Sequence, residues 1–351
     1  MENMKTLLAV CLAGWIVAGS TSAQEIDQIT GSIQSHIASQ NWDGADQGYE
    51  ALYQAYKAEY GAGSGRALAM AKVLGEWKIQ AFRNGLLSGS EENILGDTSS
   101  FYRELISEIE QQQDQLAADL IDPLYGQVMV NYHQFLLTSR KPLSAYQGVG
   151  EELIQEEQCV DSEDRGGVVD CQYMEVPNRD YIESQAQARE DDIAQYWDAI
   201  ALSLQRVIEI CAEHRYLLDQ AEALAHLGDY HMYGGEQDLA LTTYFDAYQL
   251  LLRNTDPDAN EWLNRLFVQP TVVPSLTTVL PGASPAPILT QGLRFGFVIG
   301  ADGKASDIEV LDGAGSADRQ TRQSVMRIIT GATFRPFFDT EGVLDSHSIE
   351  I

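Results

Sequence analysis

The chain has 351 residues, of which 44% are hydrophobic, and a formal net charge of −30. This length is sufficient for a substantial core and for about two domains. Because such an acidic surface repels phosphate backbones and anionic lipid headgroups, nucleic acid and peripheral membrane surfaces are excluded as primary partners.

The N-terminal segment has the pattern of a secretory signal peptide. Lys5 precedes the apolar run "TLLAVCLAGWIVAG", and small residues follow it, so we expect cleavage after Ala23. The run is short for a membrane span, which needs about 20 apolar residues. Residues 1–23 are therefore predicted to direct export to a Gram-negative periplasm. The alternative is an uncleaved anchor in the inner membrane with the rest of the chain facing the periplasm, the one case in which the protein would contact a membrane.

Export determines how the four cysteines are interpreted. Cys11 lies within the signal segment. Cys159 and Cys171 flank the acidic, glycine-containing stretch "VDSEDRGGVVD", and in an oxidising compartment we predict a disulfide between them. In the chain-entropy model this bridge would contribute roughly 3 kcal/mol. The stretch lacks the alternating ligand spacing of a calcium loop, and a solvated loop is expected. Cys211, on an apolar helical face, is expected to be a buried thiol.

Residues 24–266 have helical periodicity, and no strand is predicted among them. Long amphipathic segments such as "FYRELISEIEQQQDQLAADL" and "IAQYWDAIALSLQRVIEICAEH" alternate with breakers such as "GAGSG" and "PNRD". A region of this kind is expected to fold as a series of packed helices.

One part of this region carries a repeat-like pattern. In "LAHLGDYHMYGGEQDLALTTYFDAYQLL", Leu227-Gly228 is followed by Ala240, Tyr244 and Ala247. A glycine in one helix and alanines in the next allow a close approach, and an aromatic ring fills the space beside them. This unit resembles the tetratricopeptide repeat. Weaker echoes occur at Ala45 with Tyr49 and at Leu74-Gly75, and an irregular helical bundle with a chance match is the alternative.

The composition changes after Leu266. Residues 267–290, "FVQPTVVPSLTTVLPGASPAPILT", are rich in proline and are predicted to form a semi-rigid spacer. Beyond it, Leu293, Phe295, Phe297 and Ile299 alternate with other residues, which is the strand period. Asp302-Gly303 then provides a strong hairpin turn signal before a second strand, "SDIEVLD".

A helix and a final strand complete the predicted C-terminal unit. Ser316 can cap a helix whose apolar face includes Val325, Ile328 and Ile329. "FRPFF", a "TEG" turn and the last strand "VLDSHSIEI" follow. The predicted order is strand, strand, helix, strand, over residues 291–351.

This unit resembles the TonB C-terminal domain. The family pattern is matched at Phe297–Ile299, at Asp302-Gly303, at Ile308–Val310, at Gly315, at Asp318, at Phe334-Arg335-Pro336 and at Gly342-Val343. The resemblance implies a periplasmic module that docks onto outer-membrane receptors by adding a receptor segment to its sheet edge. The family's Tyr-Pro segment before the first strand is absent here, as are the N-terminal Ser and His that engage its motor.

The fold class expected is α+β in two domains, a mainly helical tetratricopeptide-like array and a small ββαβ TonB-like domain. The last strand is the candidate partner-binding edge, whose polar residues would discourage indiscriminate pairing. This edge comprises Val343, Leu344, Asp345, Ser346, His347, Ser348 and Ile349.

Three functional hypotheses remain open. The first is a periplasmic adapter whose partners are proteins or peptides, including outer-membrane receptors. The second is an anchored TonB-family energy transducer for receptor-dependent uptake. The third is an enzyme, but no Gly-x-Ser-x-Gly or His-Glu-x-x-His motif occurs, and His226 and His231 are too far apart on a helix to chelate a metal. We therefore expect no catalytic residues, no metal and no cofactor.

Overall fold

The computed structural model describes residues 21–162, 168–269, 271–273, 294–300, 302–312, 319–338, 344–345 and 347–350. It is mostly helical, with several small antiparallel strand pairs. The larger helices are α2 (Thr21–Ala38), α3 (Trp42–Tyr60), α4 (Gly65–Arg83), α5 (Glu91–Gln112), α6 (Ile121–Arg140), α7 (Arg179–His214), α8 (Leu217–Tyr233), α9 (Gln237–Arg253) and α11 (Arg319–Gly331). Shorter helical segments are η1 (Ala118–Leu120), η2 (Leu143–Ala145), α10 (Ala259–Leu263) and η4 (Asn264–Val268).

The strands are β1 (Leu153–Ser162), β2 (Val168–Pro177), β3 (Val272–Val273), β4 (Arg294–Ile299), β5 (Ala305–Asp312), β6 (Thr333–Phe334), β7 (Phe337–Phe338), β8 (Leu344–Asp345) and β9 (His347–Glu350). Contacts divide the chain into two units, one with residues up to Val130 and from Ile200 onward, the other Asn131–Ala199. In the part of the chain that is described, no helix has the length and apolarity to cross a membrane. The predicted cleavage site, Ala23, lies in the first turn of α2, and residues 1–20 lie outside the described residues.

Polar side chains mark where the early helices begin. Asn41, Ser64 and Ser90 each accept a hydrogen bond from a backbone N–H in the first turn of α3, α4 and α5. These caps satisfy donors that a helix terminus otherwise leaves unpaired. Gly61, with φ 88°, ends α3 in a conformation that residues with a side chain rarely adopt.

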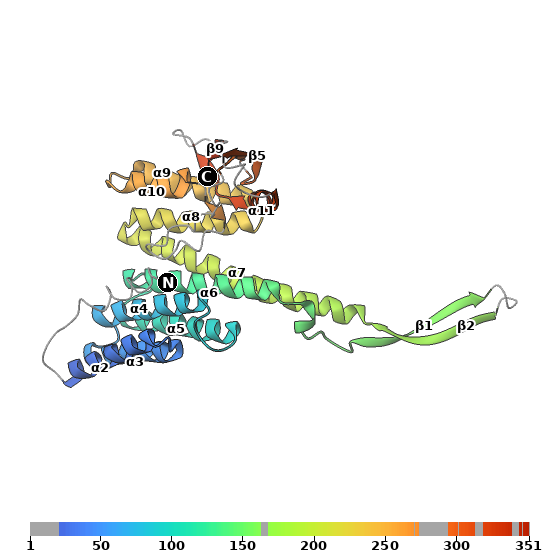
Figure 1. The fold of residues 1–351 in the computed structure, drawn as a ribbon, viewed down its shortest axis with the longest axis horizontal. Coiled ribbons are helices and arrows are strands. Elements are labelled where there is room, and N and C mark those ends of the chain that lie inside the picture. The colour runs from blue at the N-terminus through green and yellow to red at the C-terminus, as the bar shows by residue number, and fades with distance from the viewer. Residues whose placement is uncertain are drawn as a thin grey trace. The chain divides into compact units, whose positions relative to one another are not determined.

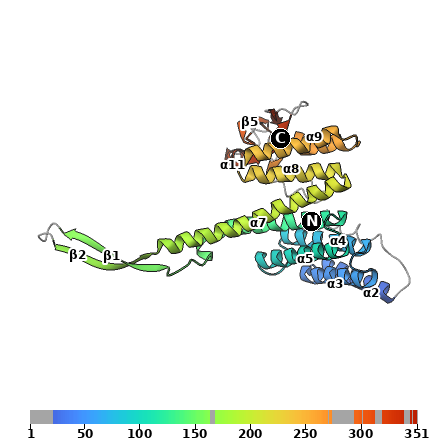
Figure 2. The ribbon, with the colours of Figure 1, turned by 180° about the vertical axis from the view of Figure 1, so that it is seen from behind.

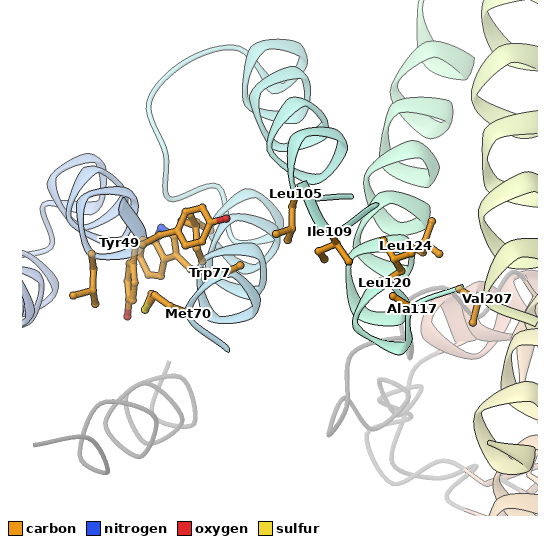
Figure 3. Packing of buried hydrophobic residues seen from close by; sticks show 14 of the residues in the cluster. Tyr49, Met70, Trp77, Leu105, Ile109, Ala117, Leu120, Leu124 and Val207 are labelled. Atoms are coloured by element: carbon orange, nitrogen blue, oxygen red, sulfur yellow. The ribbon is translucent and has the colours of Figure 1, made fainter. Parts of the chain in front are cut away.

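The core of the first unit runs through α2–α6 and continues to the C-terminal part of α7 and to α8 (Figure 3). Tyr49 of α3 stacks on Trp77 of α4 with ring centroids 4.9 Å apart. The Trp77 indole N–H donates to Asp46 Oδ1 at 2.9 Å, so the buried ring keeps a partner for its polar atom. Figure 3 shows the same cluster continuing through Leu105 and Ile109 toward Val207.

Glycines let three pairs of helices approach closely. A Cβ added to Gly126 of α6 would lie 2.1 Å from Tyr102 Cε1, and one added to Gly75 of α4 would lie 2.4 Å from Tyr102 Oη. In α8, a Cβ on Gly228 would lie 2.5 Å from Tyr244 Cδ1 of α9. The close approach that we predicted from Leu227-Gly228 and Tyr244 is therefore present.

The second unit corrects one prediction. Residues 153–177 were expected to lie in a helical region with a solvated loop, but β1 and β2 form a long antiparallel hairpin. The backbone register places Cys159 directly opposite Cys171. In Figures 1 and 2 the two strands run side by side beyond the N-terminal end of α7. The helical expectation failed because charged residues in β1 hide the alternation of apolar and polar residues that is typical of a strand. The valines of β2 were the available signal for a strand, because β-branched residues favour this conformation.

The helices of this unit hold the base of the hairpin. Asn178 N donates to Glu152 O at 2.9 Å, which closes the strand pair next to α7. Phe135 of α6 packs on Trp197 of α7 with ring centroids 4.9 Å apart. Tyr173 and Met174 of β2 are exposed, so the described part of this hairpin buries little apolar surface. Two-stranded hairpins with little burial are marginally stable, so the predicted cross-strand disulfide would stabilise this one.

Thiol labelling tests the predicted disulfide. Of the three cysteines after Ala23, none should react with iodoacetamide in the native, unreduced protein, and two should react after reduction. Cys211 should react only in denaturant, because burial raises the pKa of its thiol to about 12. Intact mass reports each step. Labelling of Cys159 and Cys171 without prior reduction would contradict the prediction.

Candidate interaction edge of the C-terminal sheet

The C-terminal sheet is built on the alternation of β4. Phe295, Phe297 and Ile299 point to one side and are buried under α11, which contributes Val325 and Ile329. The predicted apolar face of α11 is correct for these two residues. Ile328 is 59% exposed and does not belong to that face. Leu293 and Ser316 lie outside the described residues.

The predicted turn at Asp302-Gly303 joins β4 to β5. Gly303 has φ 70°, and its N–H donates to Gly300 O at 2.9 Å. A Cβ at Gly303 would lie 2.4 Å from Phe334 O, so glycine is required by conformation and by space. Phe334 N in turn donates to Gly303 O at 2.7 Å, which ties the turn to β6.

The three-stranded sheet has the order β5-β4-β9, and β9 lies at one edge. Its register with β4 runs antiparallel from Gly296 opposite Glu350 to Ile299 opposite His347. Of the candidate edge residues, His347, Ser348 and Ile349 belong to β9.

The remaining candidate edge residues lie elsewhere. Leu344 and Asp345 form β8, which pairs with β7 rather than with β4. Val343 and Ser346 lie outside the described residues. The expected single last strand is therefore divided into β8 and β9. The predicted order strand, strand, helix, strand is also incomplete, because β6 and β7 are additional short strands. Pro336 follows β6, and its lack of an N–H helps to keep these strands short.

A buried ion pair joins the segment between β6 and β7 to α8. Arg335, 2% exposed, donates through Nε to Asp229 Oδ1 at 2.9 Å and through Nη2 to Oδ2 at 2.7 Å. Its Nη1 donates to Leu266 O at 3.0 Å. Asp229 also accepts from Tyr244 Oη at 2.8 Å, and His226 Nδ1 lies 3.7 Å from its Oδ2. This two-pronged geometry is the strongest form of an arginine–carboxylate contact.

The electrostatics of the pair follow from its setting. Burial alone would raise the pKa of Asp229, but Arg335, with the hydrogen bonds around the carboxylate, lowers it below its usual range. Burial disfavours the charged guanidinium, yet Asp229 raises the pKa of Arg335 above its ordinary value. Burial and the adjacent Asp229 together raise the pKa of Tyr244. Both members of the pair are therefore charged at neutral pH.

Aromatic packing and backbone pairing support the same junction. The Phe338 ring lies 5.3 Å from that of Tyr248 in α9 and 5.8 Å from that of Phe267. Residues 272–273 pair with Thr333–Phe334 as β3 and β6.

The chain matches no protein-family model and no curated protein. The residues of the junction and of the sheet must therefore be interpreted from their own chemistry.

The junction changes the expected role of the proline-rich spacer. We expected residues 267–290 to hold the tail away from the helices, yet Phe267 is buried and Thr271 O accepts from Arg335 N at 2.8 Å. Residues 274–293 lie outside the described residues. Within "FRPFF", Arg335 contacts α8 and Phe338 packs on α9, whereas Phe337 belongs to the core of the sheet itself. The arginine and the second phenylalanine after the proline of "FRPFF" are the signal that our sequence interpretation missed.

Proposed function

We propose that the chain is a periplasmic adapter that binds protein partners and has no catalytic activity of its own. The C-terminal module is proposed to act like a TonB C-terminal domain in one respect, the addition of a partner strand at its edge. The observation that carries the proposal is the position of β9 at one edge of the sheet β5-β4-β9. An open edge offers main-chain donors and acceptors to an extended segment.

The helical region is proposed to be a divergent tetratricopeptide-like array. Support comes from the paired use of glycine and tyrosine, Gly228 with Tyr244 and Gly75 with Tyr102, in two separate helix contacts. Arrays of this kind present a surface for a second partner. The ion pair between Asp229 and Arg335 would hold the sheet in a constant orientation on α8. The resulting adapter would present its two binding surfaces rigidly.

Proline substitutions in β9 test strand addition. Because successive N–H groups of a strand point to opposite sides, only one of Ser348 and Ile349 directs its N–H toward β4. Ser348→Pro and Ile349→Pro are both made. The substitution at the residue whose wild-type N–H points away from β4 should keep the melting temperature within about 2 °C and should abolish capture of outer-membrane proteins.

Alanine at each position is the matched control, because it retains the N–H. Wild-type protein and the alanine variants should recover the same outer-membrane proteins. Equal recovery by a stable proline variant would overturn strand addition. The energy-transducer alternative is tested in the same preparation, since a mature N-terminus at Gln24 in the soluble periplasmic fraction would exclude an anchored protein.

A further inference from the structure

The hairpin β1–β2 leaves its second strand open along one edge. In the part of the chain that the structure describes, β1 and β2 pair only with each other. No backbone hydrogen bond from a described residue outside the hairpin reaches β2. The outer edge of β2 therefore carries main-chain donors and acceptors that a further strand can pair with. A two-stranded hairpin is marginal by itself, and a third strand would stabilise it.

Two neighbouring side chains of β2 indicate what kind of partner fits this edge. Tyr173 is 70% exposed and Met174 is 50% exposed. Because successive side chains of a strand point to opposite faces, these two lie on different sides of the hairpin. A partner that rests on one face would cover only one of them. A strand that runs beside β2 presents side chains to both faces and would cover both.

The two faces of β2 differ in their chemistry. Tyr173 and Glu175 share one face, and Met174 and Val176 share the other. Glu175 is exposed and forms no ion pair with any residue that the structure describes. On the first face, a lysine or arginine of the partner would pair with Glu175 and lie over the ring of Tyr173. On the second face, an apolar residue would pack on Met174. The edge therefore fits an extended segment in which basic and apolar residues alternate.

The charge of the hairpin region argues against a second copy of the chain as this strand. Residues 151–177 contain nine acidic residues and one basic residue, so two hairpins side by side would bring like charges together. Carboxylates on an edge strand also discourage aggregation, which accounts for the acidic residues. It does not account for an exposed tyrosine beside an exposed methionine, since both side-chain types are enriched in protein interfaces.

We propose that the outer edge of β2 binds a partner protein by adding an extended segment of alternating basic and apolar residues as a third strand. Tyr173 and Met174 anchor the segment on the two faces, and Glu175 selects its basic residues. This site is separate from the edge strand β9, so either proposal can fail without the other.

Calorimetric titration of the full chain with short peptides tests the proposal. The probe alternates lysine with valine. Three control peptides have the same residues in two blocks, glutamate in place of lysine, or an N-methyl group on every backbone nitrogen. Only the probe should bind saturably, because the controls remove, in turn, the alternation, the charge complementarity and the main-chain donors. Equal binding of any control peptide, or no binding of the probe, would overturn the proposal.

Substitutions on the two strands locate the binding edge. Tyr173→Ser and Met174→Ser should each weaken binding of the probe about threefold, and together about tenfold, because they contact it on opposite faces. Glu175→Gln should also weaken binding about threefold. Leu153→Ser and Glu156→Gln are the matched controls on β1, where both residues are exposed, and should leave binding within about 1.5-fold. Equal weakening by the β1 and β2 variants would contradict addition at the edge of β2.

Hydrogen exchange of the same complex distinguishes the two edges of the protein. Amides of β1 and β2 should exchange about tenfold more slowly when the probe is bound, and those of β9 should not change. Protection of β9 without protection of β2 would place the peptide on the C-terminal sheet. That result would overturn the present proposal and would support strand addition at β9.

Discussion

Replacing Arg335 by methionine is expected to lower the free energy of unfolding by about 3–5 kcal/mol. The substitution leaves Asp229 charged, buried and without its main partner. Arg335→Lys should recover only part of the loss, because an ammonium group cannot reproduce the two-pronged contact. Urea unfolding at pH 7 measures both values.

A double substitution separates the charge from the packing. Asp229→Leu combined with Arg335→Met removes both charges and should be less destabilised than the sum of the two single variants. Arg179→Met is the matched control, because its ion pair with Glu183 is exposed on both sides and should change stability by less than about 0.5 kcal/mol. Additive single effects would contradict a coupled, buried ion pair.

The stability of the wild type and that of Arg335→Met should depend on pH in opposite directions. In the wild type the pKa of Asp229 is lowered by folding, so the contribution of this group is complete above its unfolded pKa, about 4. That contribution is lost as pH falls toward the folded pKa. In Arg335→Met, burial instead raises the pKa of Asp229, so acidification below neutrality should restore part of the lost stability. Denaturation at pH 7 and pH 5 compares the two proteins.

Alanine substitutions of two helical glycines are expected to change the stability of the protein in opposite directions. Gly126→Ala should destabilise the protein by about 2 kcal/mol, because the new methyl group overlaps the buried ring of Tyr102. Gly96→Ala in α5 should stabilise it by about 0.5–1 kcal/mol, because no atom lies within 4 Å of the added Cβ. Chemical denaturation measures both.

A smaller ring provides the control for Gly126. Tyr102→Leu should itself be destabilising, but Gly126→Ala should cost less in that background, because the leucine can yield space to the methyl group. Stabilisation by Gly126→Ala in the wild-type background would show that α5 and α6 can separate without penalty. That result would contradict the close packing described above.

Features encoded by neighbouring residues could be predicted from the sequence. The turn at Asp302-Gly303 and the alternation from Phe295 to Ile299 each depend on only a few residues, and both are present. The approach of Tyr244 to Gly228 was predictable because the two helices are joined by a short connection. Local patterns of this kind have a single geometric solution.

Features that combine distant residues could not be predicted in this way. Asp229 and Arg335 are separated by 106 positions, and nothing in the helical pattern of α8 distinguishes a buried aspartate from a solvated one. Glu76 of α4 and Asp219 of α8 likewise line one cavity although they are far apart in the sequence. The hairpin β1–β2 was missed for another reason, since its charged residues conceal the period of two. Tertiary packing decides which of the many acidic side chains are buried and which stay exposed to solvent.

The separation of Asp229 and Arg335 also has a consequence for biosynthesis. The ribosome makes α8 and its aspartate well before the arginine that neutralises it, which lies 106 positions further along the chain. Until that arginine is available, burial of Asp229 is opposed by the cost of desolvating a lone charge. The last contacts of α8 and α9 must therefore wait for the final part of the chain. The cluster that α8 and α9 form with Phe267 is therefore completed only when the C-terminal segment has joined it.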